Sequence, residues 1–261
     1  MAENLVEMWA VAIISPLKMR GWLERSLDLL YPPICALCRV NLTEGDALCS
    51  PCEQDLPRLK PPFCQRCGEA FQGQIEDEFV CPNCHDLKFA FEFARSALIR
   101  DERTLEMIHR LKYGRELHLA KDLGRLATES FADPRLAFAL ADQWPLVPVP
   151  LHRKRLQHRH FNQAEEICRV LARCTGLPQI KALKRIRATE HQTRLSRTQR
   201  MENLRGAFAM TRAGRRQIGK SSAGVVLVDD VFTTGSTVGE CAKILRRAGF
   251  QRVVVITVMR G

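Results

Sequence analysis

The sequence contains no hydrophobic run long enough to cross a membrane and no segment typical of a secretory signal. The apolar run of residues 9–14 is too short to span a bilayer, and Pro16 follows it. Glu3 and Glu7 stand where a secretory signal would carry positive charge. We therefore expect a cytoplasmic protein without a transmembrane segment, either free or peripheral at the inner membrane.

Tyrosine and tryptophan are scarce, since the chain of 261 residues has only 2 Tyr and 3 Trp. Surfaces that bind single-stranded nucleic acid stack the bases on aromatic side chains, so this scarcity argues against a dedicated base-stacking groove. Hydrophobic residues make up 46% of the chain, which is typical of a globular protein and excludes a disordered one. The length suits one α/β domain of ordinary size together with a small additional domain.

Charge is distributed unevenly along the chain. Residues 1–90 carry 8 Lys and Arg against 13 Asp and Glu, a net charge of −5. Residues 91–261 carry 32 against 16, a net charge of +16. A domain with such a basic excess needs an anionic partner, and phosphate-rich substrates and nucleic acids are the candidates.

Cysteine is abundant, with eleven residues, and eight of them form four Cys-x-x-Cys pairs before residue 85. Two such pairs can complete a tetrahedral four-thiolate zinc site, and without a secretory signal metal is favoured over disulfides. We expect two structural zinc ions in sequential sites, and a cross-braced arrangement is the alternative. The sequential ligand sets are Cys35, Cys38, Cys49 and Cys52, then Cys64, Cys67, Cys81 and Cys84. Few large apolar residues lie between these pairs, so metal would hold the segment folded.

The strongest functional signal is an apolar strand, residues 225–228, followed by Asp229, Asp230 and a hydroxyl-rich loop. Four consecutive apolar residues, mostly β-branched, indicate a strand covered on both faces, as in a parallel sheet. Residues 233–237 read Thr-Thr-Gly-Ser-Thr and open a helix, so this loop offers N–H groups and hydroxyls to an anion. Two carboxylates beside it would repel phosphate unless they hold hydroxyls or a divalent cation. The simpler interpretation is a strand–turn–helix in which these residues merely cap the helix.

This stretch resembles the phosphoribosyl-pyrophosphate motif of type I phosphoribosyltransferases. The resemblance implies that Asp229 and Asp230 contact the 2′- and 3′-hydroxyls of the ribose. It also implies a 5′-phosphate site made by Thr233, Thr234, Gly235, Ser236 and Thr237. Mg²⁺ would bridge the pyrophosphate and the ribose hydroxyls and neutralise developing charge.

A strongly basic segment, residues 151–164, follows a strand that ends in prolines, and we expect it to be a loop. At this place a phosphoribosyltransferase has a loop that neutralises the leaving pyrophosphate. Arg153 and Lys154 are the expected contacts because they follow the strand most closely. The alternative is a solvated charge run.

Hydrophobic periodicity and turn residues give a coarse plan of the chain. Strands are expected at residues 94–99, 144–150 and 252–258, and helices at 104–112, 117–131, 162–174 and 238–248. Asn162 should cap the third of these helices, and Gly176 should end it. Residues 211–223 are expected to form a surface loop. The predicted domains are a leader helix (1–33), a double zinc ribbon (34–90) and an α/β domain (91–261).

Several segments together resemble the ComF family, competence-associated and phosphoribosyltransferase-like proteins that include GntX-like members. The matching segments, in order, are residues 30–33 with the cysteine pairs, 108–114, 147–152, 159–164, 192–196, 203–208 and the acid-pair motif. One departure is His160, because the family usually has glycine there, and the position is expected to need an unusual backbone angle. The resemblance implies a type I phosphoribosyltransferase fold, a mostly parallel sheet flanked by helices, with a zinc-ribbon head.

The family resemblance implies a protein that binds phosphoribosyl pyrophosphate and is linked to DNA uptake, competence or nucleotide metabolism. As an enzyme it would transfer the phosphoribosyl group to a nitrogen nucleophile whose identity nothing in the sequence indicates. The alternative is a single-stranded-DNA-binding adaptor, working with a helicase or another competence protein, whose phosphoribosyl site is sensory or vestigial. A third hypothesis is a regulator that binds phosphoribosyl pyrophosphate without turning it over.

Overall fold

The structure is a computed structural model, and two compact units can be recognised in it, residues 1–55 and residues 56–261. It describes residues 33–42, 47–71, 73, 79–85, 87–188, 197–218 and 224–261. The leader helix expected over residues 1–33, except its last residue, and the matching segment 192–196 lie outside these ranges. The domain boundary expected at residue 90 stays a prediction.

The described part of the first unit is a small turn structure that carries four cysteines. Ile34 and Asn41 form an isolated antiparallel bridge, and the amide of Cys35 donates to the carbonyl of Val40 at 2.8 Å. The short helix α3 (Ser50–Gln54) follows, and none of its residues is buried. In the described part of this unit the buried residues are Cys35, Ala36, Ala47 and Leu48, which are small apart from Leu48, so metal at the cysteines would add much of its stability.

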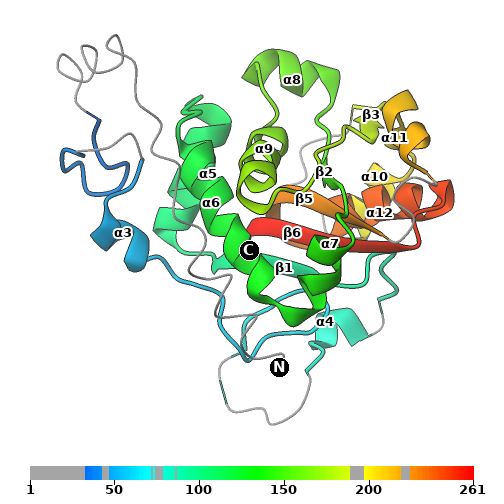
Figure 1. Cartoon of the computed structure of the whole chain (residues 1–261), viewed down its shortest axis with the longest axis horizontal. Helices are drawn as coiled ribbons and strands as arrows, with labels where there is room; N and C mark the ends of the chain where they lie inside the picture. The colour runs from blue at the N-terminus through cyan, green and yellow to red at the C-terminus, as the bar shows by residue number, and fades with distance from the viewer. Residues whose placement is uncertain are drawn as a thin grey trace. The chain divides into compact units, whose positions relative to one another are not determined.

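A parallel sheet of four strands forms the centre of the second unit (Figure 1). Each strand is parallel to its neighbours. Their order is β1 (Ala94–Ile99), β6 (Arg252–Arg260), β5 (Gly224–Phe232) and β2 (Leu146–Pro148). Nearly every residue of β5 and β6 is buried, as expected for parallel strands covered on both faces. The predictions of a buried strand at residues 225–228 and of a mostly parallel sheet are therefore confirmed.

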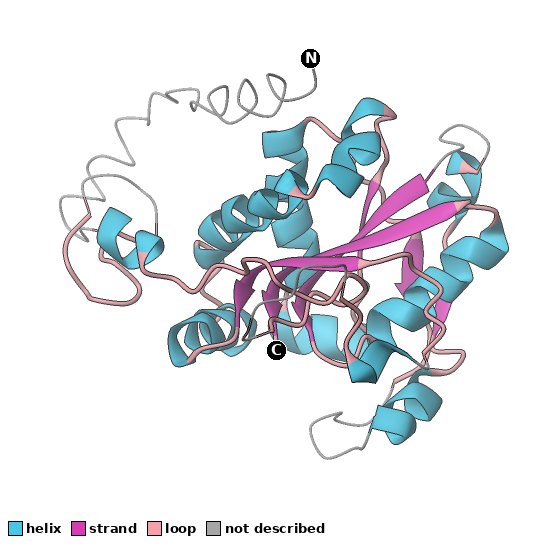
Figure 2. Cartoon of the chain, turned by 90° about the horizontal axis from the view of Figure 1, so that it is seen from below, coloured by secondary structure: helices cyan, strands magenta, loops and turns pink. Residues whose placement is uncertain are grey.

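Helices cover both faces of this sheet (Figure 2). One face is packed by α6 (Leu119–Ala127) and α9 (Gln163–Thr175), with α5 (Glu102–Tyr113) beside α6. The other face is packed by α12 (Ser236–Ala248), which contacts α10 (Arg197–Leu204). None of the helices in the described ranges is long and apolar enough to cross a membrane.

Shorter elements complete the second unit. A separate antiparallel pair joins β3 and β4. The bounds are α4 (Pro82–His85), η1 (Thr128–Ala132), η2 (Pro134–Leu136), α7 (Ala137–Ala141), β3 (Leu183–Arg185) and β4 (Phe208–Met210). The helix expected at residues 117–131 is thus an α-helix continued by a 3₁₀ turn.

Two segments expected to be loops contain helices, so those predictions are wrong. The basic segment after β2 forms α8 (Arg153–Arg159), and α11 (Arg212–Gln217) lies within the expected surface loop. None of the side chains of α8 is buried, so the hydrophobic periodicity that reveals most helices is missing. Side-chain caps start both helices instead, from His152 in α8 and from Thr211 in α11.

The predicted ends of α9 are confirmed. The side chain of Asn162 accepts a hydrogen bond from the amide of Ala164 at 3.2 Å, and Gly176 ends the helix with φ 74°. His160, which ends α8, has φ 68° and ψ −6°, in the left-handed region that favours glycine. The unusual backbone angle expected at this position is therefore confirmed.

Replacing His160 by glycine should raise the free energy of unfolding by about 0.5–1 kcal/mol. Left-handed backbone costs an L-residue roughly 1–2 kcal/mol, and the greater freedom of glycine in the unfolded chain offsets part of that gain. Urea denaturation of His160→Gly measures the effect. His160→Ala is the control, because it keeps the strain, and a glycine variant less stable than the alanine variant would contradict the argument.

Candidate functional site

The acid pair, Asp229 and Asp230, lies near the carboxyl end of β5 and is buried, with exposed fractions of 9% and 4%. In open α/β sheets ligands bind outside the carboxyl ends of the strands. The backbone amide of Asp230 donates to Oδ1 of Asp229 at 2.9 Å. Lys112, near the end of α5, forms an ion pair with the carboxylate of Asp230.

The pKa values of the two carboxyl groups are shifted in opposite directions. Burial raises the pKa of Asp229 well above its ordinary value, and the adjacent charge of Asp230 raises that pKa further. Burial acts the same way on Asp230, but the charge and hydrogen bond of Lys112 outweigh it, so the pKa of Asp230 lies below its ordinary value. The site thus holds one carboxylate kept ionised by a lysine and one that accepts a proton readily.

Arg159, the last residue of α8, brings positive charge to the acid pair. Its charge helps to lower the pKa of Asp230. The guanidinium lies over the ring of Tyr113 at 5.0 Å and donates to Oε1 of Gln163 at 3.1 Å. These contacts hold the side chain between α5 and the start of α9.

Arg155 and Arg185 extend this positive region. Burial, followed by the charge of Arg155, lowers the pKa of Arg185 to about 10, so Arg185 stays charged at neutral pH. Asp229 has the opposite effect on that pKa, which places Arg185 within electrostatic range of the acid pair. An isolated bridge between His152 and Arg185 holds β3 beside the start of α8.

The expected pyrophosphate contacts, Arg153 and Lys154, lie in α8, and their role stays a prediction. Arg153 and Lys154 are exposed, whereas Arg155 and Arg159 are half-buried. Residues four apart lie on the same face of a helix, so Arg155 and Arg159 face the site together. In a loop the first basic residues after the strand, Arg153 and Lys154, would lie nearest to the site, whereas in the helix they are exposed. The contact with Lys112 was also missed, although this residue lies in the segment 108–114 that carried part of the family resemblance.

The hydroxyl loop, residues 233–237, follows β5 as expected, and its last two residues are already the first residues of α12, which begins two residues earlier than expected. Gly235 has φ 74°, and a Cβ atom there would lie only 2.8 Å from Cζ of Phe232, so backbone and space both require glycine. The hydroxyl oxygens of Thr234 and Ser236 lie 2.8 Å apart. The loop leads into the N-terminus of a 13-residue helix, whose dipole and free N–H groups favour an anion.

Within the described residues, eight cysteine thiols form two groups. These are the first cluster, Cys35, Cys38, Cys49 and Cys52, and the second cluster, Cys64, Cys67, Cys81 and Cys84. In each group the sulfur atoms lie within 4.8 Å of one another, so the sequential arrangement is confirmed. In each, the amide of the third cysteine donates to the sulfur of the first, at 3.4 and 3.3 Å. Four thiolates fit tetrahedral Zn²⁺ and leave no open position, as in a structural site.

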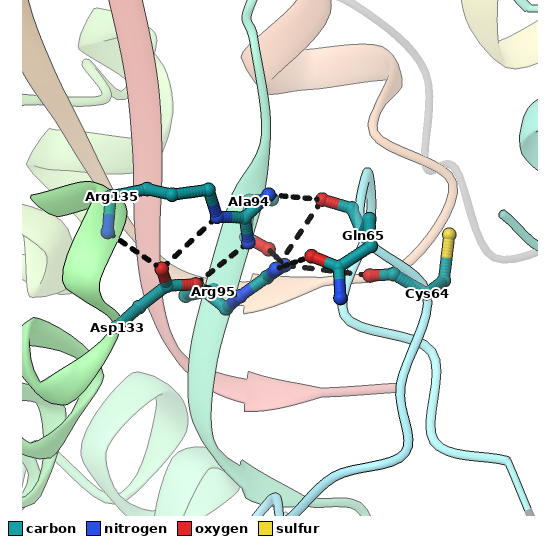
Figure 3. Close-up of polar contacts among 6 residues, drawn as sticks. All are labelled: Cys64, Gln65, Ala94, Arg95, Asp133 and Arg135. Carbon is teal, nitrogen blue, oxygen red and sulfur yellow. Dashed lines mark hydrogen bonds and ion pairs between the residues drawn. The ribbon is translucent and has the colours of Figure 1, made fainter. Parts of the chain in front are cut away.

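The second cluster is built into the core of the second unit, since its four cysteines are buried and pack with β5 and β6. Figure 3 shows the hydrogen bonds that connect Arg95 of β1 to the turn with Cys64 and Gln65, the first turn of the second cluster. Arg95 forms an ion pair with Asp133 at 2.6 Å and donates to the carbonyls of Cys64 and Gln65 at 3.4 and 3.3 Å. Arg135 also donates to Asp133 and to the carbonyl of Gln65, so both arginines connect these two residues.

Comparison with known proteins agrees with these features. The double zinc ribbon domain matches residues 26–85. The chain is similar to competence protein F of Haemophilus influenzae, with 31% identity over 228 residues, which cover 85% of this chain and 94% of that protein. The chain belongs to the ComF family.

Two further ComF-family relatives match over similar lengths. The DNA utilization protein YhgH of Escherichia coli strain K12 is 32% identical over 231 residues, covering 87% of this chain and 96% of that protein. Competence protein ComFC of Bacillus subtilis is 24% identical over 244 residues, covering 84% and 91%. Each of these alignments covers more than four fifths of this chain.

The ion pair between Lys112 and Asp230 should stabilise the fold in a pH-dependent way. Lys112→Met leaves a buried carboxylate unpaired and should lower the free energy of unfolding at pH 7 by about 3 kcal/mol. The lysine lowers the folded-state pKa of Asp230, so its stabilisation is present above the unfolded-state pKa. It is lost as pH falls through the lowered folded-state value. Chemical denaturation between pH 7 and pH 3 should show the two proteins converging, and a constant difference would contradict this.

Proposed function

We propose that this ComF-family chain binds phosphoribosyl pyrophosphate with Mg²⁺ and uses this site in the uptake or utilization of DNA. The observation that carries the proposal is the buried acid pair directly before the hydroxyl loop. Asp229 and Asp230 would accept hydrogen bonds from the ribose 2′- and 3′-hydroxyls. The 5′-phosphate would bind at residues 233–237, where the helix dipole, amides and hydroxyls meet.

The charges around the acid pair support a ligand that has hydroxyl groups at one end and phosphate groups at the other. A carboxylate pair alone would repel phosphates, and a purely basic site would not retain two buried acids. Arg155, Arg159 and Arg185 supply positive charge on the side of α8 and β3. The pyrophosphate would lie against these guanidinium groups, which can bind phosphate oxygens bidentately.

Lys112 could change its partner when the ligand binds. Without ligand its ammonium neutralises Asp230. A ribose hydroxyl or Mg²⁺ at the acid pair would compete with this ion pair, and the long side chain could then turn to the pyrophosphate. A cation there would also lower the raised pKa of Asp229, because a nearby positive charge favours the ionised carboxylate.

Transfer would break the bond between C1 of the ribose and the pyrophosphate oxygen while a nitrogen nucleophile bonds to C1. The electron pair of the broken bond goes to the pyrophosphate, and the guanidinium groups stabilise its charge. Mg²⁺, when bound, would add further neutralisation of the leaving group. The residues of this chain would mainly position the ribose and hold the leaving group.

A second candidate function is binding of single-stranded DNA by the basic part of the chain. The net charge of +16 over residues 91–261 favours it, as do the names of the relatives, competence protein F and DNA utilization protein. In this case the phosphoribosyl site would sense a metabolite or would serve only to stabilise the fold. The zinc ribbon would contact a partner protein.

The test is calorimetric titration of phosphoribosyl pyrophosphate with Mg²⁺. The zinc-loaded protein should bind, and Asp229→Asn/Asp230→Asn should bind at least about 100-fold more weakly, because two charge-assisted hydrogen-bond acceptors are lost. Asp142→Asn changes an exposed aspartate and should leave the affinity unchanged. A folded wild-type protein that does not bind would refute the proposal. Single-stranded DNA binding that survives the double substitution would then favour the adaptor function.

The same titration separates the two faces of α8. Arg155→Met and Arg159→Met should each weaken binding about tenfold, since each removes a half-buried charge from the pyrophosphate side. Arg153→Met and Lys154→Met are matched controls on the exposed face and should have little effect. The opposite ranking would show that the residues expected from the sequence hold the pyrophosphate.

A further inference from the structure

A cavity of about 190 Å³ lies where the second cysteine cluster meets the hydroxyl loop. Its lining includes Cys67 and Cys84 from the second cluster, Thr233 and Thr234 from the hydroxyl loop, and Arg260 from the end of β6. A structural metal site therefore forms one wall of the space beside the candidate phosphate site. Such closeness raises the question of what connects the two.

Arg260 is in contact with both sides of this cavity. It is buried, with 8% of its surface exposed, and its Nη2 lies 3.9 Å from Sγ of Cys67. It forms an ion pair with Glu69, in the same cysteine loop. Its Nη1 donates to the carbonyl of Phe232 at 3.1 Å, and Phe232 is the residue directly before the hydroxyl loop.

The position of Phe232 sets where the hydroxyl loop begins. Its carbonyl accepts a second hydrogen bond from the amide of Gly261 at 2.8 Å. Its ring meets Phe91 edge-on, with centroids 5.9 Å apart, and Cζ of the ring limits the space at Gly235. Backbone and side chain are thus fixed together, so a shift at Phe232 would move the loop.

The negative charge of a zinc-bound second cluster explains why a positively charged residue, Arg260, lies beside it. Four thiolates around Zn²⁺ carry a net charge of −2, and a buried charge needs a partner of opposite sign. The guanidinium of Arg260 is suitably placed to offset part of that charge. Without the thiolates it would lose this partner, and the bond to the carbonyl of Phe232 would be less firmly held.

We propose that Arg260 is a positioning residue that couples the second zinc site to the hydroxyl loop. The thiolates hold the guanidinium, and the guanidinium holds the carbonyl of Phe232. The N–H groups and hydroxyls of residues 233–237 then stay directed at the 5′-phosphate. This inference rests on the proposed function for its ligand, and it assigns the coupling to the second cluster, because every residue of this cavity wall belongs to the second unit.

The experiment compares Arg260→Met with Arg252→Met. Arg252 lies in the same strand, but its guanidinium pairs with Glu92 at the surface. Each protein is titrated with ribose 5-phosphate, phosphoribosyl pyrophosphate and magnesium pyrophosphate, and its zinc content is measured. Arg260→Met should bind the two ligands with a 5′-phosphate about tenfold more weakly. It should bind magnesium pyrophosphate as the wild type does and should retain two zinc ions.

These ligands separate positioning from a general loss of structure. Equal weakening of all three ligands by Arg260→Met would indicate a damaged fold and overturn the inference, as would unchanged affinity for all of them. Arg252→Met should match the wild type with every ligand. A wild-type protein that binds none of the ligands would refute the proposed function, and the coupling is then judged without ligand.

Hydrogen exchange at the amides of residues 233–237 provides that judgement. Exchange there should be at least tenfold faster in Arg260→Met and in Cys84→Ser, which disrupts the second cluster. It should be unchanged in Arg252→Met and in Cys52→Ser, which disrupts the first cluster. Unchanged exchange in both Arg260→Met and Cys84→Ser would overturn the coupling, whether or not phosphoribosyl pyrophosphate binds.

Discussion

Burial of two adjacent carboxylates near the end of one strand is the constraint on which the rest of this site depends. Desolvation and mutual repulsion both oppose their ionisation. Lys112 from α5 and arginines from α8 and β3 supply positive charge that opposes these effects, and these elements are far apart in sequence. Part of the positive charge of residues 91–261 is therefore gathered around two acids. Such an arrangement would favour a ligand that satisfies carboxylates and guanidinium groups at once.

Local patterns account for what could be predicted from the sequence. The buried strand before Asp229, the glycine of the hydroxyl loop, the Asn162 cap and the grouping of the cysteines each depend on a short stretch of chain. The helix α8 could not be predicted, because side-chain caps and charge, and not apolar periodicity, define it. The contact of Lys112 with the acid pair joins segments more than one hundred residues apart, and no local pattern encodes such a contact.

The double zinc ribbon is one domain in sequence, but its two cysteine clusters have different surroundings. The first cluster includes an exposed cysteine, Cys38, and the short helix α3 beside it buries none of its residues. The second cluster is part of the core of the α/β unit and is fastened to β1 through Arg95. Metal at the second site therefore contributes to the same cooperative core as the sheet.

The strand order has a consequence for synthesis of the protein. β6 comes last among the strands of this sequence, yet it lies between β1 and β5 in the sheet. During translation β1 and β5 therefore emerge without the strand that joins them, and their backbone N–H and C=O groups on that side stay unpaired until β6 is made. All eight zinc ligands precede β1, so metal can order the cysteine loops on the ribosome before the sheet closes. The acid pair gains its complete surroundings only once β6 has been made.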